Sequence, residues 1–148
     1  MLDRVLMVCT GNICRSPMAE ALLRERLGGR PKARVASAGI AALVGEPADP
    51  VARDLLAERG LDISGHRARQ LTAGLAAGFD LVLVMERRQV RQVEAMFPFL
   101  RGRIRRIGEY GDFDVPDPYR EPRTAFARAL SLIERGIQDY ARAVWRAT

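Results

Sequence analysis

A cysteine and an arginine, Cys9 and Arg15, lie close together in a segment that reads Cys-Thr-Gly-Asn-Ile-Cys-Arg-Ser. The apolar run Val5–Val8 precedes this segment and Pro17 follows it, so the segment is an expected loop between a strand and a helix. Backbone N–H groups of such a loop point inward at the positive end of the helix dipole and form a cradle for an anion. The same field favours the nucleophilic thiolate of Cys9, and the guanidinium of Arg15 can bind two phosphate oxygens at once. The loop therefore predicts a nucleophile and a phosphate clamp.

The neighbours of Cys9 suit the same purpose. Gly11 lets the backbone approach an anion, Asn12 tolerates a left-handed conformation, and Ser16 can donate a hydrogen bond to a thiolate. The alternative for Cys9, a small buried residue that closes a strand, does not account for these neighbours. No Gly-Lys-Ser/Thr pattern follows, so ordinary nucleoside triphosphate binding is unsupported. We expect the substrate to be bound by the loop residues Thr10, Gly11, Asn12, Ile13, Cys14 and Ser16.

A second candidate catalytic group lies far along the chain, in the segment Asp114–Tyr119, which reads Asp-Val-Pro-Asp-Pro-Tyr. A thiolate that attacks phosphorus must expel a leaving group, and an aryl oxide whose conjugate acid has a pKa of about 10 leaves far more easily when protonated. Two prolines stiffen the chain around Asp117, which makes it the expected general acid. Tyr119 could line the pocket mouth and stack on a substrate ring. The alternatives are that Asp117 only forms a turn and that Tyr119 only anchors the loop.

Four buried-strand patterns alternate with helical patterns along the chain. This alternation predicts an α/β fold: a single-domain open four-stranded parallel sheet with helices on both faces and the phosphate-binding loop after the first strand. Ligands of such sheets bind beyond the carboxyl ends of the strands, where the strand order reverses. The expected strands are residues 4–9, 33–38, 79–85 and 103–107, and the expected helices are residues 17–27, 51–59, 86–97 and 122–145, with a short one after Thr72 and a long loop over residues 109–120.

Several helix ends carry their own signals. Ser16 is placed to cap the first helix, and Pro17 suits its first turn. Asp49 is an expected cap and Pro50 an expected first residue of the second helix, which Gly60 ends.

Length and composition narrow the classes of protein. A chain of 148 residues with 48% hydrophobic residues suits one domain over residues 1–148. Two cysteines and one histidine are too few for a structural zinc site or a disulfide framework, so we expect no metal, no cofactor and a reducing cytoplasm. The apolar runs fall far short of the ~20 residues that span a bilayer, so we expect no membrane insertion.

The net charge of +6 invites a nucleic-acid interpretation, which the sequence does not favour. The arginines are scattered and stand beside acidic residues, as in Arg24-Glu25-Arg26, which is typical of solvated helix faces. We expect no nucleic acid among the partners and an anionic, phosphorylated partner instead.

The run Val8–Pro17, together with Asp117-Pro118-Tyr119, resembles the low-molecular-weight protein tyrosine phosphatases. The resemblance extends nearly end to end through Ser37-Ala38-Gly39, Gly65–Gln70 and Met85-Glu86. It implies that Cys9 is the nucleophile, that Arg15 holds the phosphate and the transition state, and that Asp117 acts first as acid and then as base. It also implies a network of hydrogen bonds that shapes the loop, formed by Asn12, Ser16, Ser37 and His66. For His66 the alternative is a surface or otherwise satisfied loop histidine.

The chain departs from many family members after the second expected strand, where an aromatic residue commonly forms a wall of the substrate cleft. Here Ile40–Gly45 is aliphatic, and Leu43 or Val44 would supply the wall. This stretch resembles the bacterial branch associated with exopolysaccharide or capsule production, whose implied partner is an autophosphorylating tyrosine kinase.

The resulting hypothesis is a protein-tyrosine-phosphatase that hydrolyses phosphotyrosine through a phosphocysteine and releases inorganic phosphate. An arsenate reductase is an alternative, although its redox cycle needs additional cysteines and only Cys14 is present. A non-catalytic phosphotyrosine-binding module is another, but it would have no reason to keep both Cys9 and Asp117. Cys14 itself could form a regulatory disulfide with Cys9, or could simply pack beneath the loop.

Overall fold

The structure, a computed structural model, describes residues 2–145. Its strands form one sheet in the order β2-β1-β3-β4, and all paired strands run parallel. The fold class predicted from the sequence is therefore confirmed. The elements in chain order are β1 (Arg4–Cys9), α1 (Arg15–Arg26), β2 (Arg34–Gly39), α2 (Pro50–Ala57), α3 (Ala73–Ala76), β3 (Leu81–Val84), α4 (Arg87–Met96), the 3₁₀ turn η1 (Pro98–Leu100), β4 (Ile104–Arg106) and α5 (Arg123–Ala143).

The strand β1 lies in the interior of the sheet. Its residue Val5 is in register with Val35 of β2 on one side and with Leu81 of β3 on the other. The chain adds β2 on the first side and then crosses to add β3 and β4 on the second side. The strand order thus reverses at the carboxyl end of β1, where an open parallel sheet binds its ligands.

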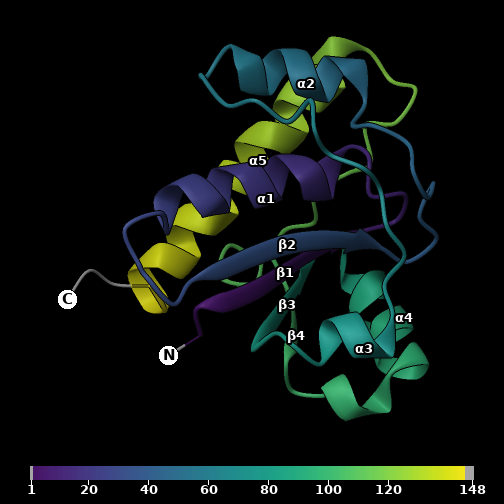
Figure 1. Cartoon of the computed structure of the whole chain (residues 1–148), viewed down its shortest axis with the longest axis vertical. Coiled ribbons are helices and arrows are strands. Elements are labelled where there is room, and N and C mark those ends of the chain that lie inside the picture. The colour runs from purple at the N-terminus through teal and green to yellow at the C-terminus, as the bar shows by residue number, and fades with distance from the viewer. Residues whose placement is uncertain (1, 146–148) are drawn as a thin grey trace.

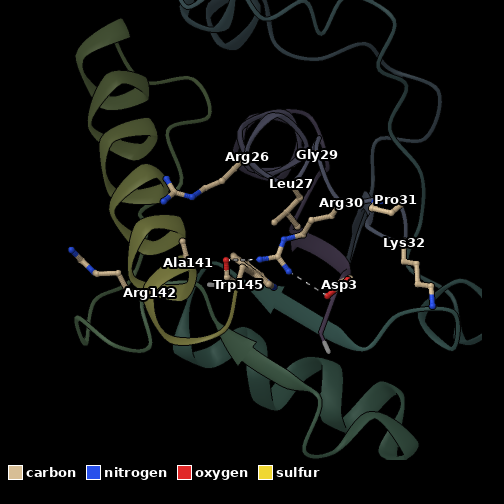
Figure 2. Close-up of a pocket in the computed structure, with 10 residues that line it drawn as sticks. All are labelled: Asp3, Arg26, Leu27, Gly29, Arg30, Pro31, Lys32, Ala141, Arg142 and Trp145. Atoms are coloured by element: carbon tan, nitrogen blue, oxygen red, sulfur yellow. Dashed lines mark hydrogen bonds and ion pairs between the residues drawn. The ribbon is translucent and has the colours of Figure 1, made fainter. Parts of the chain in front are cut away.

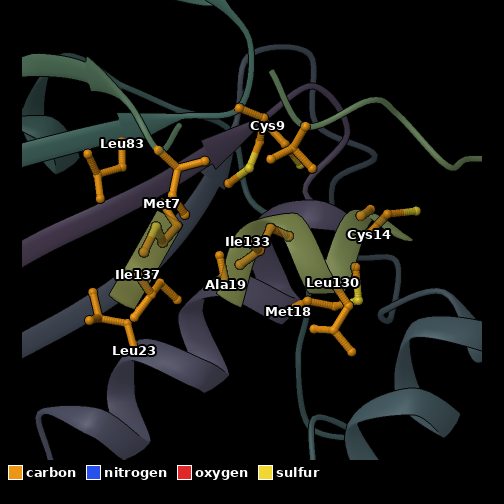
Figure 3. Packing of buried hydrophobic residues seen from close by; sticks show 14 of the residues in the cluster. Met7, Cys9, Cys14, Met18, Ala19, Leu23, Leu83, Leu130, Ile133 and Ile137 are labelled. Atoms are coloured by element: carbon orange, nitrogen blue, oxygen red, sulfur yellow. The ribbon is translucent and has the colours of Figure 1, made fainter. Parts of the chain in front are cut away.

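Helices cover both faces of the sheet, with α1, α2 and α5 on one face and α3 and α4 on the other (Figure 1). Alternate side chains of β1 point to opposite faces. Met7 and Cys9 belong to the cluster under α1 and α5, whereas Leu6 and Val8 belong to the second cluster. Figure 3 shows Cys9 and Cys14 at the edge of the first cluster, so the candidate nucleophile lies where the packed core meets the loop.

The helix ends follow most of the sequence signals. The side chain of Asp49 accepts a hydrogen bond from the backbone N–H of Val51, Gly60 has a φ of 77°, and Thr72 caps α3. The expected cap at Ser16 is wrong, because α1 already begins at Arg15 and Cys14 occupies the cap position. The loop runs straight into the helix, and the hydroxyl of Ser16 is used inside the loop instead. None of the helices described is long and apolar enough to cross a membrane.

Candidate active site

The side chain of Asn12 fixes the conformation of the loop after β1. Asn12 has a φ of 60°, the left-handed conformation expected from its residue type, and is fully buried. Its amide nitrogen donates hydrogen bonds to the hydroxyls of Ser16, at 2.8 Å, and Ser37, at 3.0 Å. Its amide oxygen accepts one from the backbone N–H of Arg69 at 2.9 Å. One side chain thus ties the loop to α1, β2 and the segment before α3.

Two further members of the predicted network contact the loop directly. The hydroxyl of Ser16 lies 2.9 Å from Sγ of Cys9, where it can donate to a thiolate. Nε2 of His66 lies 2.7 Å from the backbone oxygen of Asn12, and because that oxygen can only accept, Nε2 carries the proton. The structure therefore brings Asn12, Ser16, Ser37 and His66 together beneath the loop.

Arg15 is the most constrained charged side chain of the site, with 1% of its surface exposed. Its Nη1 donates to Oε2 of Glu86 at 2.7 Å and to the backbone oxygen of Val115 at 2.9 Å. Its Nη2 lies 3.8 Å from Oδ2 of Asp117. Its Nε is buried without a hydrogen-bond partner among the described residues. A buried donor without a partner is costly, and a phosphate oxygen would satisfy it.

Glu86 is a part of the site for which the sequence predicted no role. It lies two residues beyond the end of β3, beside the loop after β1, and its side chain is 16% exposed. Its carboxylate fixes one edge of the Arg15 guanidinium and leaves Nε and Nη2 for an anion. A carboxylate just beyond a strand next to the central one is a signal that could have found it.

Asp117 lies on the segment between β4 and α5, as expected, and is about half exposed. The backbone N–H of Tyr119 donates to its Oδ1 at 3.1 Å, which leaves Oδ2 toward Arg15. The segment is fixed to the sheet by Val115, whose N–H donates to the backbone oxygen of Met85 at 2.9 Å. The segment after β4 thus places the candidate general acid, Asp117, next to the loop that follows β1.

These groups meet in a cavity of about 170 Å³. Cys9, Arg15 and Asp117 all line it. Leu43 and Tyr119 form part of its wall and are each about two-fifths exposed, as expected of residues at a pocket mouth. Asn12 and Ser16, expected to bind substrate, are fully buried and support the loop rather than line the cavity. The remaining lining residues are Thr10, Gly11, Ile13, Cys14 and Ala41.

A larger hollow of about 660 Å³ lies at the opposite end of the sheet, near Trp145. Figure 2 shows Lys32 and Arg142 pointing outward on opposite sides of it. Arg30 instead turns to the backbone oxygen of Trp145, at 2.7 Å, and to Asp3. Because its cations diverge, this hollow does not offer the converging donors of the cavity at Cys9.

The two thiols of the cavity differ in their surroundings. Both cysteines are free and buried. Burial, assisted by the charge of Asp49, raises the pKa of the Cys14 thiol far above its ordinary value. Cys14 is therefore a neutral thiol at physiological pH, so it is not the candidate for the nucleophile that attacks phosphorus. Within residues 2–145, no three or more His, Cys, Asp or Glu side chains gather in a way that could hold a metal ion.

A thiol and a guanidinium in an anion cradle at the carboxyl end of a parallel sheet, with a carboxyl group across the cavity, define the cysteine-dependent phosphatase class of site. Comparison with known proteins agrees, since a family model described as low molecular weight phosphotyrosine protein phosphatase matches residues 4–148. The chain belongs to this family.

Individual relatives cover nearly the whole chain. It is 50% identical over 140 residues to a Ralstonia nicotianae protein named probable low molecular weight protein-tyrosine-phosphatase EpsP, covering 95% of this chain and 94% of the relative. The structure of Vibrio vulnificus Wzb in complex with benzylphosphonate aligns with a TM-score of 0.91 at 39% identity, over 97% of this chain and 100% of that chain. The YwlE arginine phosphatase from Geobacillus stearothermophilus aligns with a TM-score of 0.88 at 32% identity, over 96% of this chain and 92% of that chain.

Proposed function

We propose that this protein hydrolyses phosphotyrosine in other proteins, with Cys9 as nucleophile, Arg15 as phosphate clamp and Asp117 as general acid and base. The observation that carries the proposal is the buried Nε of Arg15, which has no protein partner in the described structure, on a side chain that lines the cavity with Cys9. The loop amides add further donors at the amino end of α1.

The proposed reaction has two displacements. In the first, the thiolate of Cys9 forms a bond to phosphorus while the bond from phosphorus to the phenol oxygen breaks. Asp117 gives its proton to that oxygen, and tyrosine leaves. In the second, the carboxylate of Asp117 takes a proton from water, whose oxygen bonds to phosphorus as the bond to sulfur breaks. The products are inorganic phosphate and the free thiolate, and Arg15 holds the equatorial oxygens in both steps.

The walls of the cavity support an aromatic leaving group. Ile13 and Leu43 offer apolar contact to a phenyl ring, and Tyr119 offers a ring for stacking, whereas neither aliphatic side chain can hydrogen-bond a charged guanidinium. This distinction matters because an arginine phosphatase shares the fold. The structure of Wzb in complex with benzylphosphonate is that of a relative bound to a phosphonate that carries a phenyl ring. An arsenate reductase is less well supported, since the chain holds only two cysteines.

The substrate class is tested by turnover of matched peptides that carry phosphotyrosine, phosphoserine or phosphoarginine, with arsenate reduction assayed in parallel. We expect hydrolysis of the phosphotyrosine peptide to exceed that of the other two by at least about a hundredfold, equivalent to about 2.7 kcal/mol of differential transition-state binding. Preferred hydrolysis of phosphoarginine, or steady arsenate turnover, would contradict the proposal.

We further propose that the physiological partner is an autophosphorylating tyrosine kinase of exopolysaccharide production and that the protein acts in the cytoplasm. The aliphatic stretch Ile40–Gly45 and the relatives named EpsP and Wzb support this assignment. The basic surface, with a net charge of +6, favours a phosphorylated, anionic partner. The test is dephosphorylation of such a kinase from the same organism, compared with a phosphotyrosine protein of unrelated origin.

A further inference from the structure

Arg106, the last residue of β4, is a charged side chain that the proposed reaction does not use. Only 7% of its side chain is exposed, although it lies next to the segment that carries Asp117. Burial of a guanidinium is unfavourable unless its donors are satisfied by charged partners. Its backbone oxygen is fixed as well, because the buried hydroxyl of Tyr140 donates to it at 3.0 Å.

The partners of Arg106 are two carboxylates of the acid-bearing segment. Its Nη2 lies 2.6 Å from Oδ1 of Asp112, and its Nη1 lies 2.9 Å from Oδ1 of Asp114. Arg87, the first residue of α4, contacts the same two carboxylates through its guanidinium, at 2.7 Å, and its backbone N–H, at 3.0 Å. The bend of the segment also holds Asp112 at a φ of 52°. A left-handed residue that contacts two arginines indicates that these contacts fix the backbone conformation of the segment at Asp112.

Only two residues separate Asp114, which Arg106 contacts, from the candidate general acid Asp117. Val115, directly after Asp114, is fully buried and hydrogen-bonded through both its N–H and its C=O, to Met85 and to Arg15. Asp117 then lies between Pro116 and Pro118, whose φ angles are fixed by their rings. Little backbone freedom therefore remains between the Arg106 contacts and the carboxyl group of Asp117.

The ion pairs of Arg106 and Arg87 with the two carboxylates persist at neutral pH because both carboxyl groups have lowered pKa values. Hydrogen bonds from Arg106, with the charge of Arg87, lower the pKa of Asp112. Partial burial alone would raise the pKa of Asp114, but hydrogen bonds from Arg106 and Arg87 outweigh burial and lower it. Both carboxylates are therefore ionised at neutral pH.

We propose that Arg106 is a positioning residue for the general acid: it holds Asp112 and Asp114 so that Asp117 stays within reach of the leaving oxygen. This inference rests on the acid role proposed for Asp117. A residue that acts through the acid affects only reactions that need the acid. A residue that merely stabilises the fold, or that acts on Arg15 through Val115, affects all substrates alike.

The test is Arg106→Met with the matched control Arg105→Met, which removes the same charge from the exposed neighbour on β4. The measured quantity is kcat/KM, which reports the chemistry up to release of the phenol, over a series of aryl phosphates. We expect Arg106→Met to lose about tenfold or more on phenyl phosphate and less than about threefold on para-nitrophenyl phosphate, whose leaving group hardly needs a proton. Arg105→Met should leave both values unchanged.

The same measurement in an Asp117→Asn background decides whether Arg106 acts through the acid. There the addition of Arg106→Met should cause no further loss that depends on the leaving group. A uniform loss across the series, or a full additional loss in that background, would overturn the inference. A flat response of Asp117→Asn itself would instead overturn the acid assignment, and the inference with it.

Should Arg106→Met fail to fold, Asp114→Ala carries the test from the other side of the contact. Asp114 is about half exposed, so its truncation leaves no buried cavity, and Arg106 keeps Asp112 as a partner. We expect the same selective loss on phenyl phosphate, and an unselective loss or no loss would refute the positioning role.

Discussion

Loss of the buried ion pair between Arg15 and Glu86 should lower the rate of catalysis, and the size of the effect can be estimated from the burial of the pair. The side chains are 1% and 16% exposed, and the two atoms are 2.7 Å apart. Glu86→Gln keeps the shape and one acceptor oxygen but removes the charge. Arg15 keeps its charge, so its bond to the amide oxygen is still a hydrogen bond to a charged group, which contributes about 1.5–3 kcal/mol. Loss of the charge on one partner moves the contact from the upper to the lower end of this range, a difference of roughly 1.5 kcal/mol, which corresponds to about tenfold in rate.

We therefore expect kcat/KM of Glu86→Gln to fall about tenfold, because Arg15 is less firmly oriented toward the transition state. Inhibition by inorganic phosphate should stay equal or become tighter, since a negative charge beside the anion site is gone. Thermal unfolding should shift down by about 2–4 °C for each kcal/mol lost. The assays are steady-state kinetics with phosphate inhibition and calorimetry, with Glu25→Gln, an exposed glutamate of α1, as control. Unchanged kcat/KM, or phosphate binding that weakens in parallel with it, would refute this reasoning.

Three further predictions follow from the same contacts. Arg15→Lys should lower kcat/KM by at least about a hundredfold in steady-state assays, because an ammonium cannot replace the two-pronged guanidinium. After inactivation by peroxide, the wild type should recover with dithiothreitol through a Cys9–Cys14 disulfide, whereas Cys14→Ser should recover poorly and accumulate sulfinic acid at Cys9 in mass spectra; equal recovery would make Cys14 structural. Because the pKa values of Asp112 and Asp114 are lowered in the folded state, their stabilisation is complete above the ordinary value of about 3.9 and is lost as pH falls through the lowered values. Unfolding measured against pH should therefore show the wild type losing its advantage over Arg106→Met only below about pH 4.

Much of this fold follows from local signals in the chain. The apolar runs at residues 4–9 and 79–85 are short and bounded by turn signals, which favours a strand over a helix. Each run does form a strand, although β3 is shorter than expected and covers only Leu81–Val84. Conformations that depend on a single side chain were also predicted correctly, namely the left-handed backbone of Asn12 and the helix cap at Asp49. Ser16 was misassigned because a hydroxyl near a helix start suits either a cap or a thiol partner.

Contacts between distant carboxylates and arginines could not be predicted in the same way. The chain holds 18 acidic and 24 basic residues, and local sequence does not say which of them meet. Glu86 reaches Arg15 across 71 positions only because β3 pairs with β1 in the sheet. Arg106 is close to Asp112 and Asp114 along the chain, but its burial depends on how α4 and α5 pack around β4. Such pairings follow from strand order, which the sequence left open.

The most direct test of the account is a search for phosphocysteine by mass spectrometry. Wild-type protein mixed with para-nitrophenyl phosphate and quenched rapidly in acid should carry a phosphoryl group on Cys9. Cys9→Ser should carry none there and show no turnover, while still binding inorganic phosphate through the loop amides and Arg15. Hydrolysis by a mass-verified Cys9→Ser sample, or a phosphoryl group trapped on any other residue, would contradict the account.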